Sequence, residues 1–197
     1  MQVAIENREI TKRARVILSG NWAPAIGAAV LYAFILIALS LIPVVGSFIQ
    51  FFISGALVVG LCTYYLNLTW GRERSTSMIF DGFGNYGNIL ITHLVTSIFI
   101  LLWTLLLIIP GIIAQYSYSQ VFYILANDPT VKPMDAIAKS KEMMQGNKFK
   151  LFCLQCRFIG WSILCVFTLG IGYFWLIPYM VTAQTVFYNE LCGNEVA

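Results

Sequence analysis

The sequence has no charged residue over three long stretches, residues 16–71, 82–127 and 158–189, which contain 56, 46 and 32 residues. Only 11% of the 197 residues are charged, whereas about 25% are charged in an ordinary soluble domain. A bilayer core about 30 Å thick needs about 20 apolar residues per helix, so each of the first two stretches is long enough for two crossings. The absence of charge therefore predicts a membrane protein.

The apolar stretches also lack the alternation of apolar and polar residues that marks a membrane β-strand. They are runs of Leu, Ile, Val and Phe in a chain that is 59% hydrophobic. Because backbone groups in hydrocarbon must bond to one another, such runs predict helices. We expect an all-α fold, a single membrane domain over residues 1–197 that forms a polytopic bundle of six transmembrane helices. Five crossings are the alternative, because Arg157 interrupts the last third.

Groups for catalysis are scarce. The chain has one histidine, and none of its nine acidic residues lies in the interior of an expected crossing. There is no Ser-His-Asp set, no pair of carboxylates, no phosphate loop and no metal motif. Cys153 and Cys156 form a CxxC without two further ligands, so we expect packing thiols. The sequence therefore predicts no enzyme, no catalytic residue, no metal and no cofactor.

All 12 lysines and arginines lie outside the three apolar stretches, in the short segments that precede and separate them. Two crossings return the chain to the side it left, so these segments share one face of the membrane. The positive-inside bias predicts that this face, with both termini, is cytoplasmic in the inner cell membrane. The net charge of +3 is modest and does not indicate nucleic acid. The expected partner is the lipid bilayer, with another membrane protein or a second copy of the chain as further options.

The first basic segment predicts an amphipathic helix. Its apolar side carries Val3, Ile10, Ala14 and Ile17, and its opposite side carries Arg8, Lys12 and Arg15. We expect this helix to lie in the interface plane, with the apolar side toward lipid and the cations toward anionic headgroups. A solvated N-terminal helix is the alternative.

Three Gly-Asn pairs recur along the chain, at Gly20-Asn21, Gly84-Asn85 and Gly146-Asn147, 64 and 62 residues apart. Each stands before a long apolar run that is later interrupted by proline or glycine, and we expect outer turns at 43–47 and 110–111. This period predicts three parallel helical-hairpin repeats, each with an amphipathic helix, a Gly-Asn stop, a helix out and a helix back. The expected boundaries are 1–69, 71–127 and 133–191. Coincidence is the alternative, because these residues are common at membrane-helix ends.

The most polar membrane segment is residues 115–120, and the last crossing has a similar polar face. Such groups avoid lipid, because an unpaired amide or hydroxyl in hydrocarbon costs a few kcal/mol. We expect them either to bond neighbouring helices or to line a polar cavity. The residues are Gln115, Tyr116, Ser119, Gln120, Tyr179, Thr182, Gln184 and Thr185.

Two ionisable residues within the expected crossings, His93 and Arg157, are further candidates for function. Ionisable groups in membrane segments often mark functional sites. A neutral imidazole near the interface also commonly bonds a neighbouring helix. The Arg157 side chain is long enough to reach back to the interface.

The chain resembles a known family over essentially its whole length, including the basic N-terminal helix. The resemblance rests on 107–111 (Leu-Ile-Ile-Pro-Gly), 116–119 (Tyr-Ser-Tyr-Ser), 127–129 (Asn-Asp-Pro), 158–161 (Phe-Ile-Gly-Trp) and 169–172 (Leu-Gly-Ile-Gly). In this order they resemble a bacterial integral membrane family, mostly from Firmicutes, known as domain of unknown function nine-seven-five. The chain is also distantly similar to the membrane domain of some glycerophosphodiester phosphodiesterases. Since their catalytic domain is not represented in these residues, the resemblance implies no activity.

We expect a non-enzymatic membrane module, an accessory or interaction protein in envelope, lipid or transport processes. The alternative is a small-solute or lipid transporter or channel that uses the polar face. A cavity lined by Gln115, Ser119 and Gln184 would favour the alternative.

Overall fold

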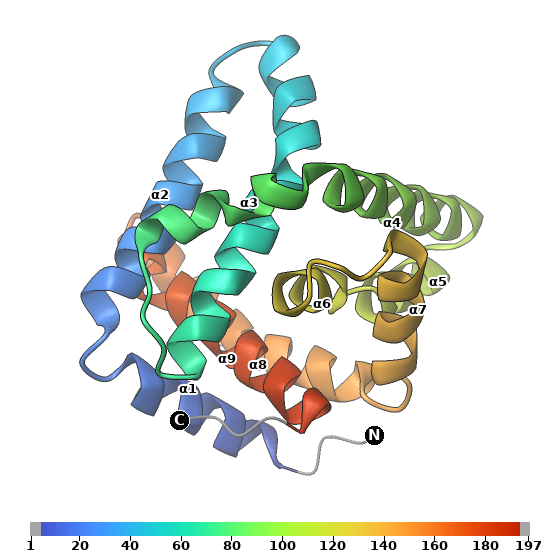
Figure 1. The fold of residues 1–197 in the computed structure, drawn as a ribbon. Coiled ribbons are helices and arrows are strands. Elements are labelled where there is room, and N and C mark those ends of the chain that lie inside the picture. The colour runs from blue at the N-terminus through green and yellow to red at the C-terminus, as the bar shows by residue number, and fades with distance from the viewer. Residues whose placement is uncertain (1–4, 194–197) are drawn as a thin grey trace.

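A computed structural model describes residues 5–193, which contain helices and no strand (Figure 1). The predicted all-α fold is confirmed over this range. Val3 and both chain termini, for which positions were predicted, lie outside the described residues. The elements are α1 (Asn7–Leu18), α2 (Trp22–Ser40), α3 (Val45–Thr69), the 3-10 helix η1 (Thr76–Asn85), α4 (Tyr86–Leu106), α5 (Ile108–Ser117), α6 (Val121–Asn127), α7 (Pro133–Met143), α8 (Lys148–Phe167) and α9 (Tyr173–Cys192).

Four helical segments within residues 5–193 are long and apolar enough to cross a membrane: Trp22–Ser40, Val45–Thr69, Thr76–Leu106 and Lys148–Phe167. Between 17% and 39% of the most apolar window of each is buried, so most of this surface remains for lipid. These helices are those of a membrane protein. The other two expected crossings, at 108–127 and 173–192, are not among the four.

The expected crossing at 108–127 is divided into α5 and α6 by a turn at residues 118–120. Serine hydroxyls before and within the turn bond to the backbone: Ser117 Oγ donates to the Ile113 carbonyl at 2.7 Å and Ser119 Oγ to the Tyr116 carbonyl at 2.9 Å. Such bonds compete with continuous helix. The polar segment therefore ends one helix and starts another, a break that hydrophobicity alone did not predict.

The three Gly-Asn pairs stand at equivalent places in the chain. Asn21, Asn85 and Asn147 are the residues immediately before α2, α4 and α8. The side-chain amides of Asn21 and Asn147 each donate at 2.9 Å to a carbonyl four residues back, in α1 and α7. Gly20 and Gly146 take left-handed φ values of 84° and 82°, which glycine adopts without steric cost. In these two pairs, glycine turns the chain and asparagine bonds the end of the preceding helix.

The tips of the hairpins consist of exposed apolar residues. The α4–α5 turn is at Leu107 rather than at the expected Pro110-Gly111, which lie in the first turn of α5. Proline is tolerated there because the first backbone N–H groups of a helix have no partner inside it. Likewise α3 already begins at Val45, inside the turn expected at 43–47. At the α8–α9 tip, Leu169 is 95% exposed.

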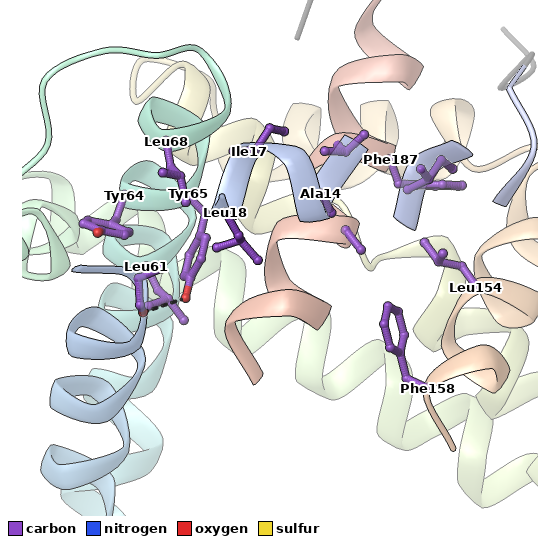
Figure 2. Close-up of a cluster of buried hydrophobic side chains, with 14 of the residues drawn as sticks. Ala14, Ile17, Leu18, Leu61, Tyr64, Tyr65, Leu68, Leu154, Phe158 and Phe187 are labelled. Atoms are coloured by element: carbon purple, nitrogen blue, oxygen red, sulfur yellow. Dashed lines mark hydrogen bonds between the residues drawn. The ribbon is translucent and has the colours of Figure 1, made fainter. Parts of the chain in front are cut away.

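The core lies at the opposite end from these tips, where the bases of the hairpins meet α1 (Figure 2). The Tyr65 hydroxyl crosses this core and donates to the Ala25 carbonyl at 3.1 Å. Ile10 and Ala14 of α1 are fully buried in the same cluster as Phe187 of α9. The apolar side of α1 was expected to face lipid. It packs on protein instead, because α9 presents a complementary apolar surface.

The hairpins do not point the same way. In Figure 1 the tip of the α2–α3 hairpin lies at the top of the view, and the α4–α5 tip lies at the right. The predicted parallel arrangement of these two hairpins is therefore not seen in this structure. Its physical reason lies in η1, which packs across α3 before α4 begins and directs the second hairpin away from the first.

The contact between α3 and η1 depends on two glycines. A Cβ atom on Gly60 of α3 would collide with the backbone carbonyl of Ile79 in η1, and one on Gly82 of η1 would collide with that of Ala56 in α3. Small residues at membrane-helix contacts let backbones approach and gain dispersion energy. Gly60 and Gly82 therefore allow α3 and η1 to pack closely.

We predict that Gly60→Ala destabilises the protein by about 1–3 kcal/mol, because the added methyl meets backbone that has no room to move. Thermal unfolding in detergent measures the change. Gly27→Ala in α2 is the matched control, since a Cβ there meets nothing within 4 Å. A Gly60→Ala variant as stable as Gly27→Ala would contradict the close α3–η1 contact.

Candidate functional site

A polar cavity of about 270 Å³ lies where α4, α5 and α6 face the α8–α9 hairpin. Its position follows from the turn at 118–120, which brings Gln115 and Tyr116 of α5 together with Tyr118 and Ser119 of the turn. The lining residues are Thr96, Ile100, Gln115, Tyr116, Tyr118, Ser119, Phe122, Gln155 and Gln184.

Hydrogen bonds hold part of the cavity wall. The Tyr116 hydroxyl donates to Gln155 Oε1 at 2.7 Å and so ties α5 to α8. The Ser119 hydroxyl accepts from Gln120 Nε2 at 3.0 Å while donating to the Tyr116 carbonyl. Gln115 is exposed and lies at the rim. The wall thus combines fixed polar groups with an amide that reaches the surface.

One lining hydroxyl is buried without a hydrogen-bond partner. Thr96 of α4 is only 6% exposed, and its Oγ1 bonds no described residue. Its neighbour one turn earlier, Thr92, instead donates to the Asn88 carbonyl at 2.7 Å. A buried hydroxyl without a partner costs about 1–3 kcal/mol, so the cavity favours a water or a solute that can bond it.

No charged side chain lines this cavity among the described residues. The lining offers amides and hydroxyls, which both donate and accept hydrogen bonds. An unpaired ion in such a place would lose its hydration without a counter-charge. The chemistry of the wall therefore suits a neutral polar molecule.

Four residues of the predicted polar face, Gln115, Tyr116, Ser119 and Gln184, meet in this cavity. The structure places the other four residues, Gln120, Tyr179, Thr182 and Thr185, outside this cavity.

Three of these four are buried helix contacts. Thr182 and Thr185 donate to the carbonyls of Pro178 and Val181 at 2.7 and 2.9 Å, and Thr185 also approaches the Tyr123 hydroxyl at 3.4 Å. Gln120 is fully buried beside Ser119, and its backbone N–H donates to Ser140 Oγ at 3.3 Å. Tyr179 instead donates to the Thr11 carbonyl of α1 at 3.1 Å.

His93 packs between α3 and α6. Its ring centroid lies 5.1 Å from that of Phe51 and 5.9 Å from that of Phe122, and Nε2 lies 3.4 Å from Ser54 Oγ. Its Cβ faces Gly55, where the missing side chain makes room. No described carboxylate pairs with it. This geometry is that of a helix contact.

Arg157 lies in a different cavity, beside α1, together with three other cations. Sequence reasoning placed it at the interface but did not bring it to α1, because that contact depends on how α1 docks.

Five lining residues were not among the predicted candidates: Thr96, Ile100, Tyr118, Phe122 and Gln155. Of these, Thr96 and Gln155 are the polar residues outside the segment 115–120. Gln155 stands alone between apolar residues two positions before Arg157, and Thr96 is one of several threonines in α4. A single threonine in a membrane helix commonly bonds its own backbone, as Thr92 does. The isolated glutamine was the signal available in the sequence.

No group of three or more His, Cys, Asp or Glu within residues 5–193 is placed to hold a metal ion. Cys153 and Cys156 are free thiols that are partly buried in α8.

The fold and this cavity together define a helical membrane protein with a polar site between its helices. Residues 104–195 match the model of the family described as "Protein of unknown function (DUF975)". No curated protein and no solved structure matches the chain significantly. The predicted family is confirmed over α5–α9, which supply most of the cavity wall. The similarity to the phosphodiesterase membrane domain stays a prediction.

We predict that the Tyr116–Gln155 bond stabilises the contact between α5 and α8 by about 0.6 kcal/mol and at most about 1.7 kcal/mol, the range for such bonds in membrane proteins. A double-mutant cycle with Tyr116→Phe and Gln155→Leu measures this coupling. A second cycle with Tyr173→Phe and Gln155→Leu is the control, because Tyr173 donates to the Ser162 carbonyl instead. Equal coupling in both cycles would contradict the assigned bond.

Proposed function

We propose that the protein is a non-enzymatic integral membrane protein whose polar cavity admits a small neutral solute or the neutral polar part of a lipid. Of the two functions considered from the sequence, this is the transporter or channel. The observation that carries the proposal is the cavity of about 270 Å³ lined by Gln115, Ser119 and Gln184 in segments that are otherwise apolar.

An empty cavity lined by unpaired polar groups is unfavourable inside a membrane. Polar side chains between membrane helices are favourable only when they are paired. Thr182 and Thr185 are paired and need no ligand. The Thr96 hydroxyl is buried and bonds no described residue. A solute with both donors and acceptors would satisfy this hydroxyl and the neighbouring amides together.

The accessory or interaction module remains the second candidate because most of the predicted polar face outside the cavity is occupied by structural bonds. Gln120, Thr182 and Thr185 all bond within the protein. In that case the cavity holds only water, and its polar groups serve packing. Solute permeability separates the two functions.

We further propose that residues 108–127 and 173–192 also cross the membrane, giving six crossings in three repeated units, with both termini in the cytoplasm of a bacterial cell. The support is the order of elements, since α1, η1 and α7 each lead through a Gly-Asn pair into a long apolar helix and a hairpin.

We predict that Thr96→Val and Gln184→Leu lower solute permeability, each by about fivefold, because each removes a hydrogen-bonding site worth about 1 kcal/mol. The measurement is stopped-flow light scattering of proteoliposomes challenged with glycerol or urea. Thermal stability of the Thr96→Val variant should not fall, since the hydroxyl that it removes bonds no described residue.

Thr92→Val is the matched control, with the same chemical change one turn away on α4. It removes a satisfied bond to the Asn88 carbonyl and should leave permeability unchanged. Permeability of the unaltered protein no greater than that of empty vesicles would reject transport of these probes. Stability losses without permeability changes would favour the accessory module.

The topology predicts that the segments at Arg72–Arg74 and Lys139–Lys148 are cytoplasmic, since the opposite threading would place all 12 basic residues outside. Single cysteines in place of Ser75 and Lys139, in a variant without the five native cysteines, should react only after the membrane is made permeable. Reaction at either position in intact cells would contradict this topology. A cysteine in place of Thr168, at the α8–α9 tip, tests whether this hairpin reaches the outer surface.

A further inference from the structure

A second polar cavity, of about 330 Å³, lies between α1, α8 and α9. Its wall carries four cations, and no acidic residue lines it. Arg8, Lys12 and Arg15 come from α1, and Arg157 comes from α8. The remaining lining residues are Thr11, Phe158, Trp161 and Tyr179.

The docking of α1 brings these cations together. Positions 8, 12 and 15 share one face of a helix because they are four and seven residues apart. The buried side of α1 packs in the same cluster as Leu154 and Phe158 of α8. The basic edge of α1 is thereby placed beside Arg157.

Little negative charge compensates these cations. Among the described residues, Glu9 pairs with Lys12 at 3.9 Å and with Arg13 at 3.7 Å, and Glu190 pairs with Arg13 at 2.7 Å. Arg8, Arg15 and Arg157 form no ion pair with a described residue. Like charges around one cavity repel, so an anion that enters it gains from all of them. Guanidinium groups match phosphate oxygens with two parallel hydrogen bonds.

An apolar groove of about 370 Å³ adjoins the cationic cavity and shares Arg15, Trp161 and Tyr179 with it. It continues along α8 to Thr168 and Gly172 at the hairpin turn. Eleven residues separate Arg157 from Thr168, a distance of about 16 Å along a helix. The rest of its lining is Trp22, Leu164, Cys165, Trp175 and Leu176.

Tyr179 forms the wall between the two spaces and is held from three sides. Its hydroxyl donates to the Thr11 carbonyl at 3.1 Å, and its ring stands at 90° to that of Phe158 with centroids 5.3 Å apart. The Arg15 guanidinium carbon lies 5.8 Å from the ring centroid. The junction of cationic cavity and apolar groove is therefore already shaped before any ligand binds.

We propose that this composite site binds an anionic phospholipid, with the phosphate in the cationic cavity and an acyl chain in the groove. A free phosphate would use only the cationic half. The groove that continues from it toward the apolar hairpin tip fits a lipid, and the inner leaflet of a cell membrane supplies anionic headgroups. This site is separate from the polar cavity and does not depend on its proposed function.

The groove supplies its own probe, because Trp22, Trp161 and Trp175 line it. The protein is reconstituted in phosphatidylcholine containing a small fraction of phosphatidylglycerol with brominated acyl chains, which quench tryptophan fluorescence on contact. We expect stronger quenching than with the same fraction of brominated phosphatidylcholine. Arg15→Gln and Arg157→Gln should each lower the relative affinity for phosphatidylglycerol by about fivefold, since one cation near a membrane contributes about that factor.

Two variants control for fold and for general charge. Arg157→Lys keeps the charge and should retain most of the preference. Lys132→Gln removes one charge at an exposed position before α7, outside the site, and should leave the preference unchanged.

Three outcomes would overturn the proposal. Equal quenching by the two brominated lipids shows no anionic site. An equal loss in Lys132→Gln and Arg157→Gln shows only a general effect of membrane charge. Inorganic phosphate that raises the unfolding temperature in neutral detergent, through Arg157 and without any lipid preference, assigns the cavity to a free anion.

Discussion

The arrangement of the other helices depends on their contacts with α9. This helix packs with α1, α2, α3 and α8, and its residues 185–189 are all buried. The Asn189 amide donates to Thr69 Oγ1 of α3 at 2.9 Å, and in a second buried cluster the Tyr188 ring stacks on Tyr123 of α6 with centroids 5.3 Å apart. Because a buried polar bond has specific geometry, the Asn189–Thr69 bond sets the register of α9 against α3 more closely than apolar packing alone.

These contacts explain why the hairpin residues are buried at one end of each hairpin and exposed at the other. The bases of the hairpins are held by α9 and α1, whereas their tips carry apolar side chains such as Leu105 and Leu169 on the surface. In water such tips would be unfavourable, but in hydrocarbon they cost nothing. The same solvent makes unpaired polar groups expensive, so the polar side chains gather between the helices. The polar cavity accordingly lies between helices, where α4, α5 and the turn at 118–120 face the α8–α9 hairpin.

Much of the fold was predictable because it rests on local chemistry. Gly20 and Gly146 must adopt left-handed φ, and the asparagines after them bond the preceding helix, so the helix starts could be predicted from the sequence. The turn at Leu107 could not, since proline suits both a turn and a first helical turn. The polarity of Gln115, Ser119 and Gln184 predicted either helix contacts or a polar cavity without deciding between them. The direction of each hairpin and the approach of Arg157 to α1 depend on tertiary contacts.

The α8–α9 hairpin contributes to both the polar cavity and the cationic site, through opposite faces. Gln155 and Arg157 are two residues apart, which places their side chains about 200° apart around α8. Gln155 accordingly lines the polar cavity and Arg157 the cationic cavity. On α9, Gln184 faces the first and Tyr179 the second. A single hairpin therefore separates a neutral site from a cationic one, and the α8 backbone between them is the part of the structure common to both.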